Sequence, residues 1–149
     1  MTNPGAIITN WSSYTSPAGF FSIKYPSDWK INRQDNIVNI CPPDMSGAVT
    51  ISAFHGVFSL DIVRNLIIES YHLDKDRFIF RIIERNGWKG IESELSIPDG
   101  GSIRQWKINA AILAKTMVLV TATDKDMNKE DRAEIYHQIF SSLFLFSKD

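Results

Sequence analysis

Cys41 is the single thiol of the sequence and the first side chain whose type could do chemistry. It would act as a nucleophile with a base drawn from one of the three histidines, His55, His72 and His137. Reactive thiols lie in electropositive surroundings, often at a helix N-terminus. Cys41 instead precedes a double proline at the end of a predicted strand, so we expect a small, half-buried apolar residue.

The histidines and the acidic segment DKDMNKED are the candidates for metal binding. Asp124, Asp126 and Asn128 match the first, third and fifth positions of a calcium loop. The sixth position requires glycine and is Lys129, and the twelfth requires glutamate and is Ile135. The segment therefore indicates a turn followed by an acidic helix start. The histidines have no metal-site spacing, and surface positions are expected for His72 and His137.

No other catalytic pattern is present in the sequence. It has no GxSxG nucleophile motif, no GxGxxG dinucleotide motif and no phosphate-binding P-loop. These observations predict a protein that is not an enzyme and that has no cofactor and no metal.

A basic and apolar strand face is the strongest candidate for binding. Arg77, Arg81 and Arg85 alternate along one face of a predicted strand, together with isoleucines, and a tryptophan follows the next turn. Such a face could be an RNA platform, but Glu92 is expected opposite Arg81, which favours a paired, solvated face. If no helix covers it, the face is an amphipathic protein-binding surface, with predicted residues Ile79, Arg81, Ile83, Arg85 and Trp88.

The elements that carry this face form a predicted β-hairpin. The runs RFIFRIIER and WKGIESELSI flank Asn86-Gly87, the strongest short hairpin signal. A two-residue turn pairs Arg85 with Trp88 and Arg81 with Glu92, and it places Phe78 opposite Leu95. The next turn, over residues 98–101, is expected to pair Ile97 with Ser102.

The remaining elements indicate the fold class. Apolar residues at helical spacing predict a helix from about Leu60 to His72, with Ser59 as its N-cap, and a second helix from about Asn128. Strands occur in runs rather than alternating with helices, which predicts an α+β fold. We expect an antiparallel β-sheet of about six to seven strands packed with two main α-helices.

Length and composition predict one domain over residues 1–149, with a loosely structured segment at 1–19. Sixteen basic against seventeen acidic residues give a net charge of −1, which disfavours nucleic acid as a partner. The first residues lack the basic and apolar pattern of a signal peptide, and no apolar run reaches eighteen residues, so we expect no membrane insertion. The single cysteine fits a reducing compartment, so a cytoplasmic location is expected.

The segment FSIKYPSDW, residues 21–29, resembles the PsbP-like superfamily, and so does the order of predicted elements over residues 20–146. That superfamily includes photosystem II extrinsic subunits, a nuclear-import factor that binds the Ran GTPase, bacterial lipoproteins and type VI effector-associated chaperones. The resemblance implies binding to another protein without catalysis. No motif of these proteins carries binding residues onto this sequence.

Two functions remain open from the sequence. The first is a non-catalytic protein-binding domain, such as an adaptor, a secretion chaperone or an immunity-type inhibitor, and self-association through the same face as a homodimer also stays open. The second is a small-molecule-binding protein or an unrecognised enzyme. An exposed apolar sheet face favours the first, and a closed pocket with convergent polar groups favours the second.

Overall fold

The computed structural model describes residues 10–147, which form two helices and two β-sheets. In chain order, the elements are β1 (Trp11–Thr15), β2 (Phe21–Pro26), β3 (Lys30–Gln34), β4 (Ile37–Cys41), β5 (Gly47–His55), α1 (Leu60–Ser70), β6 (Arg81–Arg85), β7 (Trp88–Asp99), β8 (Ser102–Leu113), β9 (Thr116–Asp124), α2 (Glu130–Ser141) and β10 (Phe144–Leu145). Neither helix of the described chain is long and apolar enough to cross a membrane.

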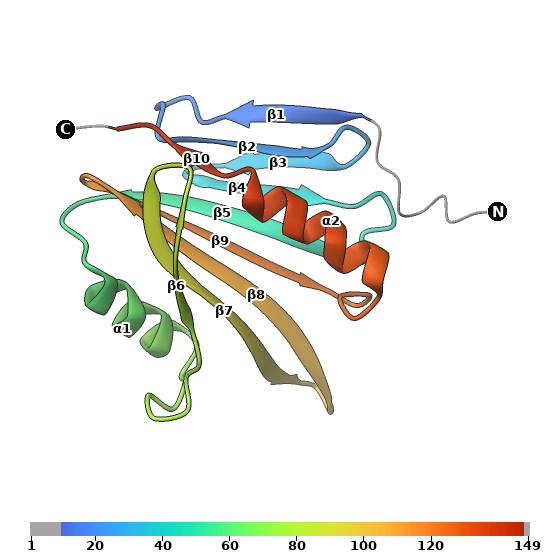
Figure 1. Cartoon of the computed structure of the whole chain (residues 1–149). Helices are drawn as coiled ribbons and strands as arrows, with labels where there is room; N and C mark the ends of the chain where they lie inside the picture. Colours follow the sequence, from blue (N-terminus) through green and yellow to red (C-terminus); the bar gives the residue numbers. More distant parts are fainter. Residues whose placement is uncertain (1–9, 148–149) are drawn as a thin grey trace.

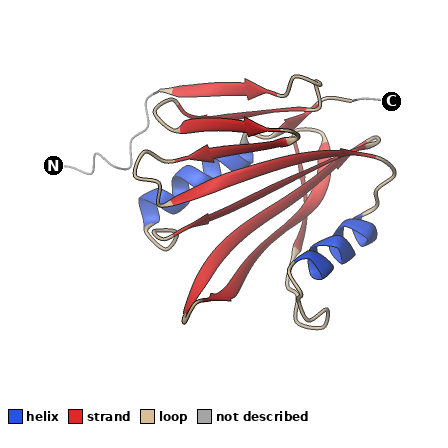
Figure 2. Cartoon of the chain, turned by 180° about the vertical axis from the view of Figure 1, so that it is seen from behind, coloured by secondary structure: helices blue, strands red, loops and turns tan. Residues whose placement is uncertain are grey.

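The larger sheet has seven strands in the order β3-β4-β5-β9-β8-β7-β6, and the smaller sheet has the order β1-β2-β10. All pairings in both sheets are antiparallel. Figure 1 shows α2 in front of the large sheet, and the view from behind in Figure 2 shows α1 nearer and α2 behind the strands. The predicted α+β fold with an antiparallel sheet and two helices is confirmed.

Each face of the large sheet has its own apolar core because side chains alternate between the faces of a strand. On one face, Val118 and Val120 of β9 pack with Tyr136 and Phe140 of α2 and with the small sheet. On the other face, Met117 of β9 belongs to a separate cluster with α1. The two helices therefore cover different parts of opposite faces and leave the β6 edge between them (Figure 1).

The hairpin at Asn86-Gly87 has the predicted register. Both turn residues have positive φ angles, 51° and 84°, as a two-residue type I′ turn requires. Arg85 pairs with Trp88 and Arg81 with Glu92.

Strand β6 is shorter than predicted, because it begins at Arg81 rather than Arg77. The predicted pairing of Phe78 with Leu95 is absent from the described ladder. The Ser93 hydroxyl donates a 2.7 Å hydrogen bond to the carbonyl of Ile79. In a continued strand, that carbonyl would accept a backbone N–H of β7 instead. The chain before β6 therefore follows β7 without backbone pairing.

The second hairpin corrects the predicted pairing of Ile97 with Ser102. Its turn is Gly100-Gly101, with φ angles of 56° and 90°, so Asp99 pairs with Ser102 and Ile97 with Arg104. The register differs from the prediction by two residues, because the turn uses the two glycines that reach positive φ without strain. A shift of two residues leaves every side chain on its predicted face.

Three element boundaries also differ from the predictions. Within the segment expected to be loose, residues 11–15 form β1, which pairs with β2, while residues 1–9 lie outside the described residues. Ser59 caps α1 as predicted, accepting a 3.2 Å bond from the Ile62 N–H, but the helix ends at Ser70. The second helix begins at Glu130 rather than near Asn128.

Candidate functional site

Strand β6 is one edge of the seven-stranded sheet. The two-residue turn makes Arg85 and Trp88 a directly hydrogen-bonded pair, and bonding direction alternates along a strand. The odd-numbered residues of β6 therefore bond to β7, and the N–H and C=O groups of Ile82 and Glu84 point outward. Among residues 10–147, no strand lies on that outer side. The strand thus presents unpaired backbone groups to an incoming chain.

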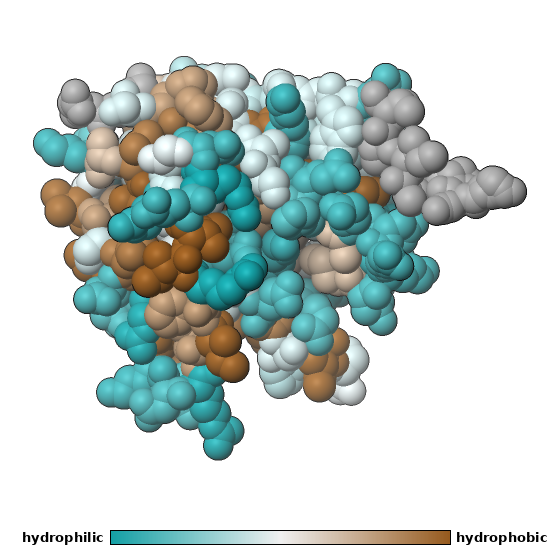
Figure 3. Space-filling model, in the orientation of Figure 1, coloured by the Kyte–Doolittle hydropathy of each residue, from teal (hydrophilic) through white to brown (hydrophobic). Residues whose placement is uncertain are grey.

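Apolar side chains are exposed along this edge. Ile79 is 82% exposed and Ile82 is 58% exposed, whereas Phe78 and Phe80 stack on each other at 5.3 Å and pack partly buried against the α1 cluster. Figure 3 shows hydrophobic atoms gathered over this part of the molecule with hydrophilic atoms around them. We refer to Ile79, Arg81, Ile82, Ile83 and Glu84 as the β6 edge surface.

A buried carboxylate holds two arginines beside this surface. Glu92 forms an ion pair with Arg81, and Arg85 Nη2 lies 3.9 Å from Glu92 Oε2. Glu92 is buried, while the Arg81 side chain is 75% exposed. One carboxylate against two guanidinium groups leaves a surplus positive charge, and Arg85 Nη1 is buried without a partner in the described chain. The cluster therefore favours an acidic group nearby.

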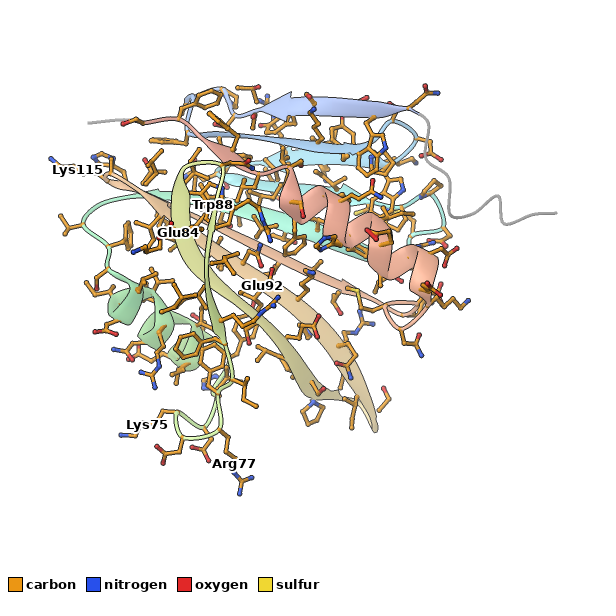
Figure 4. All side chains as sticks on the ribbon, in the orientation of Figure 1. Lys75, Arg77, Glu84, Trp88, Glu92 and Lys115 are labelled. Carbon is orange, nitrogen blue, oxygen red and sulfur yellow. The ribbon has the colours of Figure 1, made fainter. Side chains whose placement is uncertain are left out.

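Trp88 lies beneath the hairpin rather than on its surface. Its side chain is 1% exposed, and its Nε1–H donates a 3.0 Å hydrogen bond to the carbonyl of Leu143. The Asn86 side chain donates to the same carbonyl at 2.8 Å. The guanidinium carbon of Arg85 lies 6.0 Å from the centre of the Trp88 ring. Figure 4 shows Trp88 and Glu84 near the hairpin turn, with Glu92 farther along the sheet and Lys75 and Arg77 at the far end.

A second polar cluster is centred on Asp124, which is 3% exposed. Its Oδ2 accepts hydrogen bonds from Tyr136 Oη at 2.6 Å, Arg132 Nη1 at 2.8 Å and Ser46 Oγ at 3.0 Å. Burial alone would raise the pKa of Asp124, but these bonds and the backbone N–H of Asp126 hold that pKa below its ordinary value. Burial, followed by the neighbouring Asp124 carboxylate, raises the pKa of Tyr136.

This cluster joins the β4–β5 connection, the end of β9 and α2. Both carboxylate oxygens of Asp124 accept hydrogen bonds from protein donors, which fits the turn and helix start predicted for the segment DKDMNKED. No group of three or more metal-ligating side chains is present among residues 10–147. Asp124 therefore has a structural role, which is to hold these three segments together.

The candidate nucleophile is half-buried, as predicted, and burial raises the pKa of the Cys41 thiol. A raised pKa lowers the thiolate fraction at neutral pH, so the site does not activate Cys41. His72 and His137 are exposed, as predicted. His55 is also exposed, and its ring lies 6.5 Å from that of Phe20.

A cleft of about 550 Å³ lies where the β1–β2 turn and the β3–β4 hairpin meet the end of β5. Its volume falls within the range of small-molecule sites. Apolar and aromatic side chains line it together with Arg33, Asp35 and His55, and the apolar part of the lining includes Tyr14, Phe20, Val38 and Ala53.

Comparison with solved structures identifies the fold. The solution structure of cyanobacterial PsbP (CyanoP) from Synechocystis sp. PCC 6803 matches with a TM-score of 0.72 and 8% sequence identity, over 98% of each chain. The chain has a PsbP-like fold. The crystal structure of LpqN, involved in cell envelope biogenesis of Mycobacterium tuberculosis, matches with a TM-score of 0.60 and 12% identity, over 91% of this chain and 90% of LpqN.

A third match is a crystal structure of a protein from Bacteroides thetaiotaomicron VPI-5482, with a TM-score of 0.67 and 21% identity. The match covers 91% of this chain but 48% of the Bacteroides chain, so the chain spans about half of that protein. No family model and no curated protein sequence matches the chain.

Within this PsbP-like fold, the structure brings some predicted binding residues together and separates one. Ile79 and Arg81 are exposed at the β6 edge, and Ile83 and Arg85 are half-buried beside them. Trp88 was predicted to lie on this surface, but it is buried. The chain after α2 covers it, and Trp88 bonds to Leu143 there. Ile82 is not among the predicted binding residues, and it pairs with the buried Ile91, as a core residue would. The edge position of β6 exposes it nevertheless.

Proposed function

We propose that this chain is a non-catalytic protein-binding domain that recognises its partner through the β6 edge surface. The observation that carries the proposal is an unpaired edge strand that exposes Ile82 on one face and carries the surplus charge of Arg81 and Arg85 on the other, with Ile79 exposed just before the strand. Exposed apolar side chains next to arginine are typical of the residues that dominate binding energy at protein interfaces.

The PsbP-like fold supports an accessory role such as an adaptor, a secretion chaperone or an immunity-type protein, since the resemblance implies protein binding. The raised pKa of the Cys41 thiol supports the absence of thiol catalysis. A chain with one cysteine forms no disulfide within itself, which supports a cytoplasmic location for this function.

The test compares capture of proteins from the native lysate by the wild-type chain and by two variants, read by mass spectrometry. Ile79→Asp puts a charge into the β6 edge surface, and Ile103→Asp makes the same change at an exposed isoleucine of β8. We expect a protein that is captured by the wild type and by Ile103→Asp but lost with Ile79→Asp. Equal capture by both variants would contradict the proposal.

A second candidate function, small-molecule binding, is favoured by the cleft at Phe20, Arg33 and His55. Its aromatic lining suits an apolar molecule, and Arg33 in the same lining offers a partner for an acidic group of that molecule. Thermal shifts with a panel of aromatic and aliphatic carboxylates, compared between the wild type and Ala53→Leu, test it. A shift that Ala53→Leu abolishes supports the cleft, and no shift with any compound contradicts it.

A further inference from the structure

We propose that the partner binds by adding an extended, acidic segment as a new strand along β6. This inference rests on the proposed function and specifies its mode, which is main-chain pairing rather than docking of side chains alone. In strand addition, backbone hydrogen bonds supply affinity and alternate side chains supply specificity.

The backbone of β6 is arranged for such pairing. Its ladder to β7 runs without interruption from Arg81–Glu92 to Arg85–Trp88. The N–H and C=O groups of Ile82 and Glu84 point outward and have no strand beside them in the described part of the chain. Five residues in extended conformation span roughly 16 Å, which is enough for a short added strand.

The opposite edge of the same sheet differs in its side chains. Strand β3 exposes Lys30, Asn32, Arg33 and Gln34, and its one apolar residue, Ile31, is half-buried. Polar and charged side chains of this kind keep an edge strand from pairing with other chains. Strand β6 also exposes the charged side chains of Arg81 and Glu84, but it exposes the apolar side chain of Ile82 between them, which β3 does not match. The two edges therefore differ, and β6 is the one suited to an added strand.

The side chains of β6 define the chemistry of the segment that fits. One face carries Arg81 and Arg85, and the other carries Ile82 next to Glu84. Residues 77–92 hold four basic and two acidic side chains, a net charge of +2. Cross-strand neighbours of opposite charge stabilise a sheet, and apolar neighbours do the same. A segment that alternates acidic and apolar residues therefore complements β6.

A second copy of the chain complements β6 less well. Antiparallel pairing centred on Ile83 would place Arg81 opposite Arg85, and pairing centred on Glu84 would place that residue opposite itself. Like charges directly opposite destabilise a strand pair. Pairing centred on Ile82 avoids this clash but leaves both arginines without an acidic neighbour. An acidic segment of another protein is therefore the occupant we infer.

The test titrates the full-length, nitrogen-15-labelled chain with a capped probe peptide, Glu-Val-Glu-Val-Glu-Val-Glu. Binding is measured from the chemical shifts of the backbone amides of the chain. We expect saturable shifts, largest at Ile82 and Glu84, with a dissociation constant of about 1 mM for so short a strand. A peptide with lysine in place of glutamate should bind at least tenfold more weakly. Equal binding of both peptides, or no saturable shift with either, would overturn the inference.

Two variants separate main-chain pairing from side-chain docking. Ile82→Ala removes the side chain but keeps the outward N–H, and Ile82→Pro also removes that N–H, at an edge position that tolerates proline. We expect Ile82→Pro to bind the peptide at least tenfold more weakly than Ile82→Ala. Equal binding of the two variants would overturn strand addition while leaving the proposed protein binding in place, since the lysate capture by Ile79→Asp tests that separately.

Ile82→Pro could lose binding because it folds poorly, so amide hydrogen exchange of the wild type gives a second test of strand addition. The amides of Ile82 and Glu84 should exchange rapidly in the free chain and become at least tenfold protected in saturating peptide. Unchanged exchange at both amides would overturn strand addition. Protection at both amides that rises with protein concentration without peptide would show self-pairing and overturn the choice of an acidic partner.

Discussion

The indole Nε1–H of Trp88 donates a 3.0 Å hydrogen bond to the carbonyl of Leu143, which lies between α2 and β10. This bond joins the first residue after the β6–β7 turn to a residue 55 positions later in the chain. Asn86 in the turn donates to the same carbonyl. One end of β6 is therefore fixed before a partner arrives, which lowers the entropy lost on binding.

The first prediction concerns this anchor. Trp88→Phe keeps an aromatic ring in the core but removes the donor, leaving the Leu143 carbonyl with the Asn86 amide alone. We expect a loss of about 1–2 kcal/mol in the free energy of unfolding. Urea unfolding measures it, and Trp11→Phe in β1 is the matched control that keeps this bond. A stability equal to that of the wild type would contradict the role assigned to the indole donor.

The second prediction concerns the exposed arginine. Arg81→Ala removes a largely exposed partner of Glu92, which keeps Arg85 nearby, so we expect stability to fall by less than about 1 kcal/mol. Binding of the acidic peptide should weaken about threefold to tenfold, and its dependence on salt should decrease. Peptide titrations at low and high ionic strength measure both. Arg33→Ala on β3 is the control, and an equal effect there would contradict the charge argument.

The third prediction follows from the lowered pKa of Asp124. A carboxyl group whose pKa is lower in the folded chain stabilises the fold above its ordinary pKa of 3.8, and this contribution is lost as pH falls through the folded value. Asp124→Asn should cost about 3 kcal/mol at pH 7, because Arg132 and Tyr136 lose a buried carboxylate.

The difference in stability between the wild type and Asp124→Asn should shrink as pH falls below about 4, because the unfolded wild-type chain binds a proton at Asp124 before the folded chain does. Urea unfolding from pH 7 to pH 2 measures this. Some pH dependence should remain in Asp124→Asn, since Ser46 and Arg132 also lower the pKa of Asp44. A constant difference across the whole range would contradict the ionised state assigned to Asp124.

The fourth prediction concerns Gly90 in β7. A Cβ atom at this position would lie 2.1 Å from the carbonyl oxygen of Ala110 in the neighbouring strand, so the backbone would have to move. We expect Gly90→Ala to lower the unfolding free energy by about 2 kcal/mol or more. Gly56→Ala, where the Cβ would meet only the Phe58 ring at 3.4 Å, is the control. An equal loss for both variants would contradict the close-approach explanation.

The parts of the fold that depend on local signals could be predicted from the sequence. Asn86-Gly87 dictates a turn with two positive φ angles, so the register from Arg81–Glu92 to Arg85–Trp88 followed directly. The register of the next hairpin was predicted wrongly, because the turn was expected to begin at Pro98. The chain turns two residues later, at Gly100-Gly101. Strand β1 was missed since its sequence, WSSYT, is mostly small and polar.

The parts of the site that depend on distant contacts could not be predicted. Trp88 bonds to Leu143, which is 55 positions away, and Asp124 accepts a bond from Ser46, which is 78 positions away in the β4–β5 connection. Sequence alone also does not show which strand ends a sheet. That position, rather than the pattern of β6, exposes Ile82 and its outward backbone groups.

The most direct test of protein binding at β6 is site-specific photo-crosslinking in the native cell. A photoreactive residue replaces Glu84 in β6 in one variant and Asn32 in β3, the opposite edge of the sheet, in another. The account predicts one crosslinked protein from position 84 that is absent from position 32. The same crosslinked proteins from both positions, or crosslinks from position 32 alone, would contradict it.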